Sequence, residues 1–571
     1  MSASSLESRY SKSTGRKTAL LFVLGLLTLG AQGQQARGED LAIEFLYGSE
    51  KKAWITQVTD TYNRAGHMVN GKKVVIKPVA AGSGEAMEDL LSGRSKAQLF
   101  SPASGLFIEK GNARAQKDGK PLVGPTRTLV LSPVVIAMWK PMAEALGWPA
   151  KPIGWADILK VANDPEGWAT LNHPEFGLFK FGHTHPEYSN SGLISVLAEV
   201  CAGANLPRNA VLEKANVADP KTAAFLKGIE SSIVYYGKST GFFADTMFEN
   251  GFSYLSAAVL YESSVIESYD LKRHPKMEEF IKKGFPVVAI YPSDGTFWSD
   301  HPVGIVERNA NPDQRVAAQQ YIDYLLAKPQ QVLAMASGFR PGDDGIELAA
   351  PLDKAHGVDP DIDVAVRLVP SSEVIDAVVD LWRANKRGSR VVIVFDRSQS
   401  MLADQKMEFA KQGALESVKL LGDDDRLSIL LFNQRVNVLI PDGEVKAVRA
   451  QALAAIPNIL AQGQTALYDA MKRALDDLEK DARDDLITAI VLLSDGQDTN
   501  SQAAKLQDII SRLESKSERS KVRVFAIYYG RDAKKDEMEK IAKAGGALAF
   551  EGRPENIAKV FEEIRAFFAP R

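Results

Sequence analysis

The sequence predicts an α/β protein in which a two-lobed region precedes a doubly wound, Rossmann-like domain. Short apolar runs alternate with amphipathic stretches from about residue 41 to 350, which is the pattern of βαβ units. A stretch rich in Pro, Gly and Asp at residues 341–363 then interrupts this pattern. Beyond it, apolar runs of buried-strand type alternate with amphipathic helices, as in an open sheet covered on both faces. A chain of 571 residues is also too long for a single hydrophobic core.

The composition is that of folded, soluble domains. Hydrophobic residues make up 45% and charged residues 25% of the chain, which excludes a long disordered or collagenous region. The formal net charge is only -3, so no strong field attracts nucleic acid, and none is expected as a partner. The single cysteine, Cys201, cannot form an internal disulfide and is expected to be a buried small hydrophobe.

The N-terminus predicts export. Basic residues at positions 9, 12, 16 and 17 precede an apolar run at residues 19–31. As a helix this run rises only about 20 Å, short of the roughly 30 Å hydrocarbon core of a membrane. Residues 1–33 are therefore expected to be a signal peptide cleaved after Gly33, with an uncleaved anchor in the inner membrane as the alternative. In both cases the body of the chain lies in the periplasm or at the cell surface.

Five apolar runs are the clearest strand candidates of the two-lobed region, which we expect at residues 40–350 with mainly parallel sheets. They are residues 41–46, 74–79, 134–138, 254–260 and 287–291. Helices are expected between them. Residues 311–336 show helical spacing that Pro329 interrupts.

The region after the lobes divides into a linker with a connecting helix, residues 351–387, and a final domain, residues 388–571. The connecting helix is expected at residues 372–385, where apolar residues fall on one stripe. Buried strands of the final domain are expected at four wholly or mostly apolar runs. They are residues 391–395, 426–432, 486–493 and 522–528.

Oxygen-bearing side chains follow two of these strands and one loop. The strand at 391–395 runs directly into Asp396-Arg397-Ser398-Gln399-Ser400, Asp495 closely follows the strand at 486–493, and Thr465 lies in a loop before a helix. In an open parallel sheet, ligands collect at the carboxyl ends of strands. Carboxylate and hydroxyl oxygens suit Mg²⁺, with Mn²⁺ or Ca²⁺ as alternatives, better than a soft metal. The competing interpretation of Asp-x-Ser-x-Ser is an ordinary helix N-cap. The predicted metal ligands are Asp396, Ser398, Ser400, Thr465 and Asp495.

This pattern resembles the von Willebrand factor A family, whose metal-ion-dependent adhesion site has an Asp-x-Ser-x-Ser motif, then a threonine, then an aspartate. All five positions match, and the resemblance covers about residues 389–571. It implies that the three hydroxyls contact the metal, that the aspartates act directly or through water, and that an acidic residue of a protein partner completes the coordination. Arg397 and Gln399 stand where bacterial relatives often have small residues, which leaves the choice of partner open.

Three Ser-containing loops of the two-lobed region, at residues 81–85, 101–104 and 189–192, precede expected helices, and the first and third also contain Gly. Each offers hydroxyls or backbone N–H groups to a cleft, although each also fits an ordinary helix cap. With residues 132–137 and 338–341, these loops resemble bacterial extracytoplasmic solute-binding proteins of the type II periplasmic fold, over about residues 40–350. That family closes two lobes around a small solute. The resemblance implies cleft residues at Gly82, Ser83, Ser104, Ser189, Ser191, Tyr261 and Glu262.

Two further features bear on the ligand. An unpaired Glu262 carboxylate in the cleft argues against a plain oxyanion, which it would repel. The segment His183-Thr184-His185-Pro186-Glu187 has the residue types of a transition-metal site, but without a fourth ligand a solvent-exposed loop is the favoured interpretation.

Together these features predict an exported, non-enzymatic binding protein that captures a small solute and binds a protein partner through a metal. No Ser/His/Asp, Cys/His or His-Glu-x-x-His arrangement indicates hydrolysis. The alternative is the solute-binding component of an ABC-type transporter, with a permease as partner and the C-terminal domain as an assembly module. Membrane contact is expected only through an uncleaved N-terminal segment.

Overall fold

The computed structural model describes residues 40–571 except 116–120, 344, 363–364, 484, 496–497, 516–521, 531–532, 554–555, 558–559, 562–563 and 565–571. The predicted export segment, residues 1–33, lies outside the described residues. Among the described helices, none combines the length and apolar character needed to cross a membrane.

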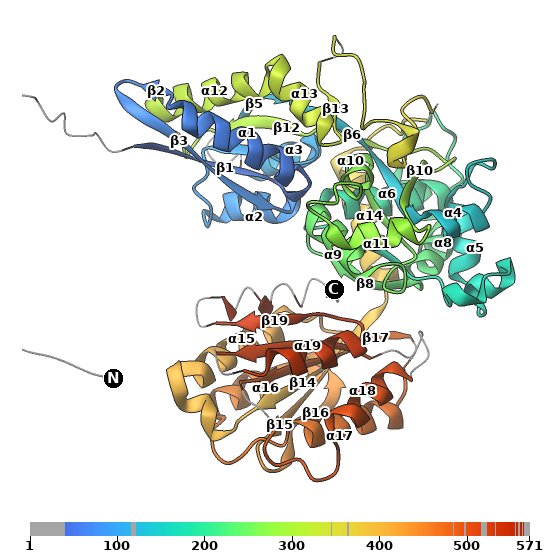
Figure 1. The fold of residues 1–571 in the computed structure, drawn as a ribbon, viewed down its shortest axis with the longest axis vertical. Helices are drawn as coiled ribbons and strands as arrows, with labels where there is room; N and C mark the ends of the chain where they lie inside the picture. The colour runs from blue at the N-terminus through green and yellow to red at the C-terminus, as the bar shows by residue number, and fades with distance from the viewer. Residues whose placement is uncertain are drawn as a thin grey trace, which may run out of the picture. The chain divides into compact units, whose positions relative to one another are not determined.

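The first lobe is a six-stranded sheet with helices packed on it, in the strand order β2-β3-β1-β4-β12-β5 (Figure 1). Strands β1, β3 and β4 are parallel, whereas β12 runs antiparallel to both β4 and β5. Its strands are β1 (Leu41–Gly48), β2 (Met68–Val69), β3 (Lys72–Ala81), β4 (Leu99–Ser101), β5 (Val123–Thr128) and β12 (Pro302–Val306). Its helices are α1 (Lys52–Ala65), α2 (Ser83–Ser92), α3 (Gly105–Ala115), α12 (Pro312–Leu326) and α13 (Lys328–Ala336).

The second lobe is built on the strand order β10-β6-β9-β7-β8, with β11 and β13 also paired to β6. Its strands are β6 (Val130–Trp139), β7 (Phe181–Thr184), β8 (Ile233–Gly237), β9 (Ala257–Tyr261), β10 (Val287–Ile290), β11 (Trp298–Ser299) and β13 (Arg340–Pro341). Its helices are α4 (Lys140–Ala145), α5 (Trp155–Ala162), α6 (Asn190–Gly203), α7 (Lys214–Val217), α8 (Pro220–Glu230), α9 (Thr240–Asn250), α10 (Glu262–Glu267) and α11 (Pro275–Lys282). Cys201 is buried in α6, as expected.

The expectation of mainly parallel sheets is wrong for both lobes, because each sheet is mixed. In the second lobe, β6 runs antiparallel to β9 and β10, while β7 is parallel to β8 and β9. The reason is that the chain passes directly from β5 into β6 and returns into β12. Parallel strands of one sheet are joined by a crossover, usually a helix. A strand that comes directly from the other lobe has no such crossover, and it runs antiparallel to its neighbours.

The expected elements of the lobes are otherwise found, with two local differences. The run expected at 254–260 becomes a strand only at Ala257, because Tyr254 closes a turn with Gly251. The long helix expected at 311–336 is two helices that meet at Ala327, which has an extended backbone. Pro329 occupies the first turn of α13, where its missing N–H needs no partner.

The segment expected as a linker packs on the second lobe. Arg367 is buried and donates hydrogen bonds to the backbone carbonyls of Leu206 (3.0 Å) and Pro207 (2.8 Å). The expected connecting helix is α14 (Ser372–Asn385), which contacts α6, α7 and α8. Its buried stripe includes Val374, Ile375, Val378 and Trp382.

The C-terminal domain is a doubly wound sheet in the order β16-β15-β14-β17-β18-β19, parallel except for β16. Side chains alternate along β14, so that Val391 and Ile393 pack with α15 while Val392 and Val394 pack with α17. The strands are β14 (Gly388–Asp396), β15 (Arg426–Phe432), β16 (Val436–Glu444), β17 (Leu486–Ser494), β18 (Arg523–Tyr529) and β19 (Ala549–Gly552). The helices are α15 (Lys406–Leu420), α16 (Val445–Ala455), α17 (Leu467–Lys480), α18 (Leu506–Glu514) and α19 (Lys535–Ala544).

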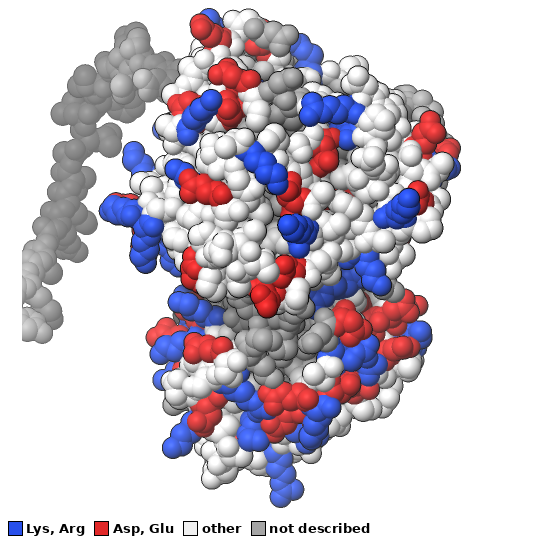
Figure 2. All heavy atoms as spheres, turned by 90° about the vertical axis from the view of Figure 1, so that its right-hand side faces the viewer, with Lys and Arg blue, Asp and Glu red and all other residues white. Residues whose placement is uncertain are grey.

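Charge on the described surface is mixed in sign. On the face drawn in Figure 2, basic and acidic side chains lie among one another instead of gathering by sign. This agrees with a formal net charge of only -3.

Candidate functional site

The carboxyl end of β14 carries the first predicted metal ligand. Asp396 is the last residue of the strand and is fully buried. One of its carboxylate oxygens accepts a hydrogen bond from the backbone N–H of Ser398 (2.7 Å), and the other accepts one from the hydroxyl of Ser494 (2.5 Å). Burial raises the pKa of Asp396 to about 6, against the lowering effect of these hydrogen bonds. The carboxylate is therefore held in a fixed orientation at the sheet edge.

Three more predicted ligands are joined in one chain of hydrogen bonds. The hydroxyl oxygens of Ser398 and Ser400 lie 3.0 Å apart, and Ser400 donates to Asp495 (2.7 Å). Asp495 directly follows β17, the strand that pairs with β14. The structure thus brings residues nearly one hundred positions apart to the same edge of the sheet, as the parallel pairing of their strands requires.

Thr465, the fifth predicted ligand, lies in a loop that is bonded to the loop after β14. Gln399 donates its backbone N–H to Gly463 (3.0 Å), and Gln462 donates to Arg397 (2.7 Å). The carbonyl of Thr465 also accepts hydrogen bonds from the backbone of Thr499 and Asn500, in the loop after Asp495. The loop that carries Thr465 is therefore bonded to both of the other loops.

Sequence reasoning missed three residues at this edge. Ser494 orients Asp396, and Asn433, at the end of β15, donates to the carbonyl of Gln462 (3.0 Å) and so holds the Thr465 loop. The third is Lys406, whose ammonium lies 2.8 Å from Asp495 and is mostly buried. Hydroxyls and amides near strand ends are too common to single out, and nothing in the sequence places Lys406 beside Asp495.

The donor set fits a hard divalent cation. Two carboxylates and three hydroxyls offer only oxygen, the donor type that Mg²⁺ prefers. The carboxylates of Asp396 and Asp495 are both buried, and the Coulombic effect of Asp495 raises the pKa of Asp396 further. A pair of buried carboxylates calls for a nearby cation, and the ammonium of Lys406 supplies one positive charge to Asp495.

We therefore expect Lys406 to compete with the divalent ion. A unit charge and a divalent ion about 4 Å apart repel each other by several kcal/mol at the effective dielectric constant of a partly buried site. Substituting Lys406→Met keeps the apolar stem and removes the ammonium, so Mg²⁺ affinity is expected to rise about tenfold or more. Isothermal titration calorimetry measures the change.

The matched control for this substitution is Lys411→Met. Lys411 lies on the same helix, α15, with a side chain as buried as that of Lys406, but it pairs with Glu408. Its substitution should leave Mg²⁺ affinity unchanged. If the Lys406 variant and the wild type bind Mg²⁺ with equal affinity, then displacing the ammonium from Asp495 costs no free energy, and the expected competition is absent.

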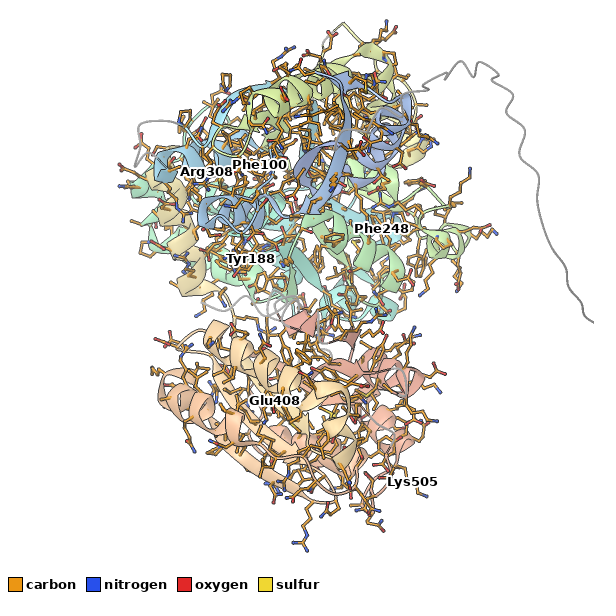
Figure 3. All side chains as sticks on the ribbon, turned by 90° about the vertical axis from the view of Figure 1, so that its left-hand side faces the viewer. Phe100, Tyr188, Phe248, Arg308, Glu408 and Lys505 are labelled. Carbon is orange, nitrogen blue, oxygen red and sulfur yellow. The ribbon has the colours of Figure 1, made fainter. Side chains whose placement is uncertain are left out.

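In the first lobe, the predicted cleft residues Gly82 and Ser83 start α2. The first N–H groups of this helix are not open to an anion, because Gly84 and Glu85 donate to the backbone carbonyl of Tyr188 (2.9 and 3.3 Å). Tyr188, labelled in Figure 3, belongs to the loop between β7 and α6 of the second lobe. Gly82 is also tightly packed, since a Cβ there would lie 2.4 Å from that carbonyl. The remaining first-lobe residue, Ser104, accepts the N–H of Leu106 as a cap of α3.

In the second lobe, three predicted cleft residues lie close together. The hydroxyls of Ser189 and Ser191 both contact that of Thr240 (3.0 and 2.8 Å). The phenol of Tyr261 accepts a hydrogen bond from Asn190 (3.0 Å), the residue between the two serines. These groups are buried and come from the starts of α6 and α9 and the end of β9.

The premise that Glu262 is unpaired is wrong. Its carboxylate accepts two hydrogen bonds from the guanidinium of Arg340 (2.8 and 2.9 Å) and one from the phenol of Tyr291 (2.5 Å). Arg340 lies 78 positions away along the chain, which is why the sequence alone did not reveal the pair. The charge of Glu262 is thus neutralised, and its argument against an anionic solute falls away.

Polar residues that the sequence did not single out complete the region between the lobes. Ser49, from the first lobe, meets the hydroxyl of Ser239 (3.0 Å) and the N–H of Gly241 (3.0 Å) in the second. The buried ammonium of Lys51 contacts Glu50 (2.8 Å) and the ring of His301 (3.2 Å). His301 lies where the chain returns to the first lobe, and its φ of 35° is left-handed.

The segment from His183 to Glu187 does not form one site, and the expectation of a solvent-exposed loop is wrong for both histidines. His185 is buried and stacks on Tyr188, with ring centroids 4.3 Å apart. Glu187 instead pairs with Arg383 of α14. His183 is fully buried and contacts Glu230 (3.0 Å).

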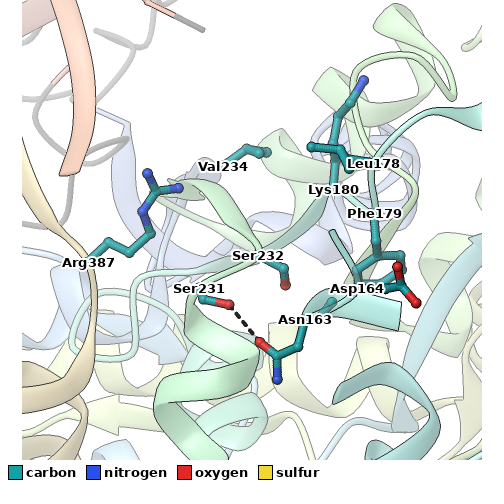
Figure 4. A pocket seen from close by; sticks show the side chains of 10 residues that line it. Asn163, Asp164, Leu178, Phe179, Lys180, Ser231, Ser232, Val234 and Arg387 are labelled. Atoms are coloured by element: carbon teal, nitrogen blue, oxygen red, sulfur yellow. Dashed lines mark hydrogen bonds between the residues drawn. The ribbon is translucent and has the colours of Figure 1, made fainter. Parts of the chain in front are cut away.

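A separate pocket of 310 Å³ opens on the second lobe and is shown in Figure 4. Ser231 donates a hydrogen bond to Asn163 (3.2 Å) at its wall. Asp164, Lys180 and Arg387 also line it, and none of the predicted cleft residues does.

Comparison with known proteins agrees with both parts of the structure. Residues 43–340 match the family described as bacterial extracellular solute-binding protein, and residues 391–563 match the von Willebrand factor type A domain. An uncharacterized protein of Synechocystis sp. is 30% identical over 176 residues, which are 30% of this chain and 40% of that protein. The chain therefore spans less than half the length of this relative.

Solved structures are similar to each part separately. A von Willebrand factor type A protein from Catenulispora acidiphila is 24% identical, with 32% of this chain and 43% of that chain covered and a TM-score of 0.28. A ferric binding protein from Campylobacter jejuni is 12% identical, with 61% and 99% covered and a TM-score of 0.40. The family match over residues 43–340 covers more than half of the chain, and both resemblances seen in the sequence are confirmed. This chain belongs to the bacterial extracellular solute-binding protein family and carries a von Willebrand factor type A domain after its solute-binding region.

Proposed function

We propose that this chain is an exported, non-enzymatic binding protein that captures a small solute between its lobes and binds a protein partner through a divalent metal. The metal is Mg²⁺, with Mn²⁺ or Ca²⁺ as substitutes, held by the five oxygen-bearing residues of the C-terminal domain. The observation that carries the proposal is the hydrogen-bonded chain of Ser398, Ser400 and Asp495 beside Asp396. The family match supports a place outside the cytoplasm.

Partner binding follows from the number of ligands. Mg²⁺ favours six oxygen ligands in near-octahedral geometry, and the proposed set in this chain has five, of which three are neutral hydroxyls. A carboxylate from an Asp or Glu of the partner supplies the sixth oxygen.

Buried polar atoms without partners support solute capture between the lobes. Within the described residues, Asn190 Oδ1, Ser263 Oγ and His301 Nε2 are buried and have no hydrogen-bond partner. Asn190 and His301 both contact Tyr261, one through a hydrogen bond and one through its ring. Such groups are rarely left unsatisfied in a folded protein. A small polar solute with several donors and acceptors satisfies them.

The full chain tests both halves of the proposal in one preparation. Immobilised chain is expected to retain exported proteins of its own organism in Mg²⁺ and to release them in EDTA, as quantified by mass spectrometry. In a thermal-unfolding screen of small polar solutes, a true ligand at about 100 times its Kd stabilises the fold by about 2.7 kcal/mol.

Matched variants separate the two halves. Asn190→Ala should abolish the thermal shift and leave partner retention intact, while Asn458→Ala, an exposed site on the C-terminal domain, should change neither. Retention that is insensitive to EDTA would refute metal-dependent docking. Failure of every solute to stabilise the wild type more than the Asn190 variant would refute the cleft.

A further inference from the structure

The interior of the second lobe contains a cluster of three ionisable residues that the solute cleft and the C-terminal domain do not use. His183 comes from β7, Glu199 from α6 and Glu230 from the end of α8. All three side chains are fully buried. One imidazole nitrogen and one oxygen from each carboxylate lie within 4.8 Å of one another. Two carboxylates and one imidazole thus converge in a medium where an uncompensated charge is strongly unfavourable.

Hydrogen bonds to groups outside the cluster use one polar atom of each residue. The imidazole Nδ1 of His183 is 2.7 Å from the carbonyl oxygen of Thr184, which only accepts, so Nδ1 carries the proton. Tyr236 donates to Glu230 Oε2 (2.5 Å), and Ser195 donates to Glu199 Oε1 (2.7 Å). The atoms that remain are His183 Nε2, Glu230 Oε1 and Glu199 Oε2.

This pattern is the one that protein metal sites show around their ligands. A metal-binding histidine commonly donates its other ring N–H to a carbonyl, and binding carboxylates are oriented by hydrogen bonds to their second oxygen. His183 Nε2 and Glu230 Oε1 are hydrogen-bonded to each other at 3.0 Å, so a metal ion at this position takes the place of the proton between them. Glu199 Oε2 is buried without any hydrogen-bond partner among the described residues, although it belongs to a carboxylate that Ser195 holds in place.

We propose that His183, Glu199 and Glu230 form a second metal site, which binds a divalent transition-metal ion such as Zn²⁺ through one nitrogen and two carboxylate oxygens. Mixed imidazole and carboxylate donors suit Zn²⁺, whereas the all-oxygen set of the C-terminal domain suits Mg²⁺. The ion joins β7, α6 and α8, and α6 begins at Asn190 in the solute cleft. Its role is to hold α6 against β7 and α8 from within the lobe.

The competing arrangement is a proton in place of the ion. Burial and then the charge of Glu230 raise the pKa of Glu199 to about 8, so without a metal this carboxyl is protonated at neutral pH. Burial opposes the charged form of His183, but the neighbouring Glu230 raises its pKa. Glutamine imitates a protonated carboxyl in shape and polarity, so Glu199→Gln preserves the proton-bound cluster and weakens a metal site.

The test measures bound zinc in a chain whose other site has been removed. Full chain with Asp396→Ala and Ser398→Ala is refolded with Zn²⁺, because a buried site fills during folding, and is then dialysed against a weak chelator. Elemental analysis is expected to find about one equivalent of Zn²⁺, coordinated as in other three-ligand sites. Adding Glu199→Gln should remove it, and adding Ser195→Ala should weaken it about 10- to 100-fold. Cobalt substitution should give ligand-field absorption that the glutamine variant lacks.

The matched control is the pair His173→Asn and Glu175→Gln, an exposed histidine and carboxylate 2.9 Å apart in the same lobe. These substitutions should leave the zinc content unchanged. Circular dichroism confirms that each variant is folded, and Ser195→Ala provides a second reading should Glu199→Gln fold poorly. Absence of tightly bound zinc in the refolded chain, or zinc that Glu199→Gln leaves in place, would overturn the proposal.

Discussion

Replacing Asp396 and Ser398 with alanine is expected to abolish measurable Mg²⁺ and Mn²⁺ binding by the C-terminal domain. Asp396 supplies a buried carboxylate, and Ser398 both donates its N–H to that carboxylate and places a hydroxyl beside Ser400. Loss of a residue that merely orients a metal ligand weakens binding by about 10- to 100-fold, so loss of two ligands should exceed about 100-fold. Calorimetric titration of the full chain with each ion measures the effect.

The control for this prediction is Asp477→Asn. Asp477 lies on α17 of the same domain and pairs with Arg473 at the surface. Its substitution removes one carboxylate from the domain without touching the predicted site, and binding should match that of the wild type. If the alanine variant also binds the ions as the wild type does, these residues do not form a metal site in the domain. The proposed function would then depend on the solute cleft alone.

The metal-site residues could be predicted because their positions follow from strand pairing. An apolar run that ends in an aspartate fixes the carboxyl end of a buried strand, and parallel neighbours place their own carboxyl ends beside it. Asp396 and Asp495 obey this rule, since β14 and β17 are adjacent and parallel. The predicted doubly wound fold and the predicted two-lobed fold are both confirmed. They could be predicted because the period and length of the apolar runs indicate which segments form strands and which form helices.

The position of Lys406 could not be predicted, because it depends on local backbone geometry. Asp404 and Gln405 both have left-handed φ values, 52° and 57°, immediately before Lys406. This turn separates the segment after Ser400 from α15 and places the first residue of the helix within reach of Asp495. Left-handed φ values are uncommon for non-glycine residues, so an Asp-Gln pair does not predict two of them in succession.

The solute region was only partly predictable, because its contacts join distant segments. Ser189 and Ser191 were found from a local Ser-Gly pattern, and they do meet at Thr240. In contrast, Ser49 and His301 reach the region through the path of the chain between the lobes. His183 likewise meets Glu199 and Glu230 only because α6 packs against both β7 and α8. A single sequence holds no record of such pairings.

Breaking the ion pair between Glu262 and Arg340 is expected to destabilise the solute-binding region. Glu262 is fully buried at the start of α10, and Arg340 is mostly buried on β13. Arg340→Met leaves the carboxylate with Tyr291 as its remaining hydrogen-bond donor among the described residues, in surroundings that cannot solvate a charge. Removing one partner of a buried ion pair typically costs about 3–5 kcal/mol, and we expect a loss in this range.

Tryptophan fluorescence during urea unfolding measures the stability of the solute-binding region separately from that of the C-terminal domain. All seven tryptophans lie between residues 54 and 382, and the guanidinium of Arg340 stands 5.0 Å from the ring centroid of Trp298. The signal therefore reports the solute-binding region even though the chain has several domains and need not unfold in one step. The midpoint should fall for Arg340→Met, while the slope with urea stays similar.

Two further variants decide whether the charge, and not simply the side chain, is responsible. Arg340→Met combined with Glu262→Gln removes both charges, and it should recover much of the loss because no buried ion remains unpaired. Arg94→Met breaks an exposed pair with Asp89 in the first lobe, where surface pairs contribute about 0–1 kcal/mol. If Arg340→Met destabilises no more than Arg94→Met, the carboxylate of Glu262 must reach water or take up a proton in the variant. If the double variant is as unstable as Arg340→Met, the arginine acts through packing on Trp298 and not through its charge.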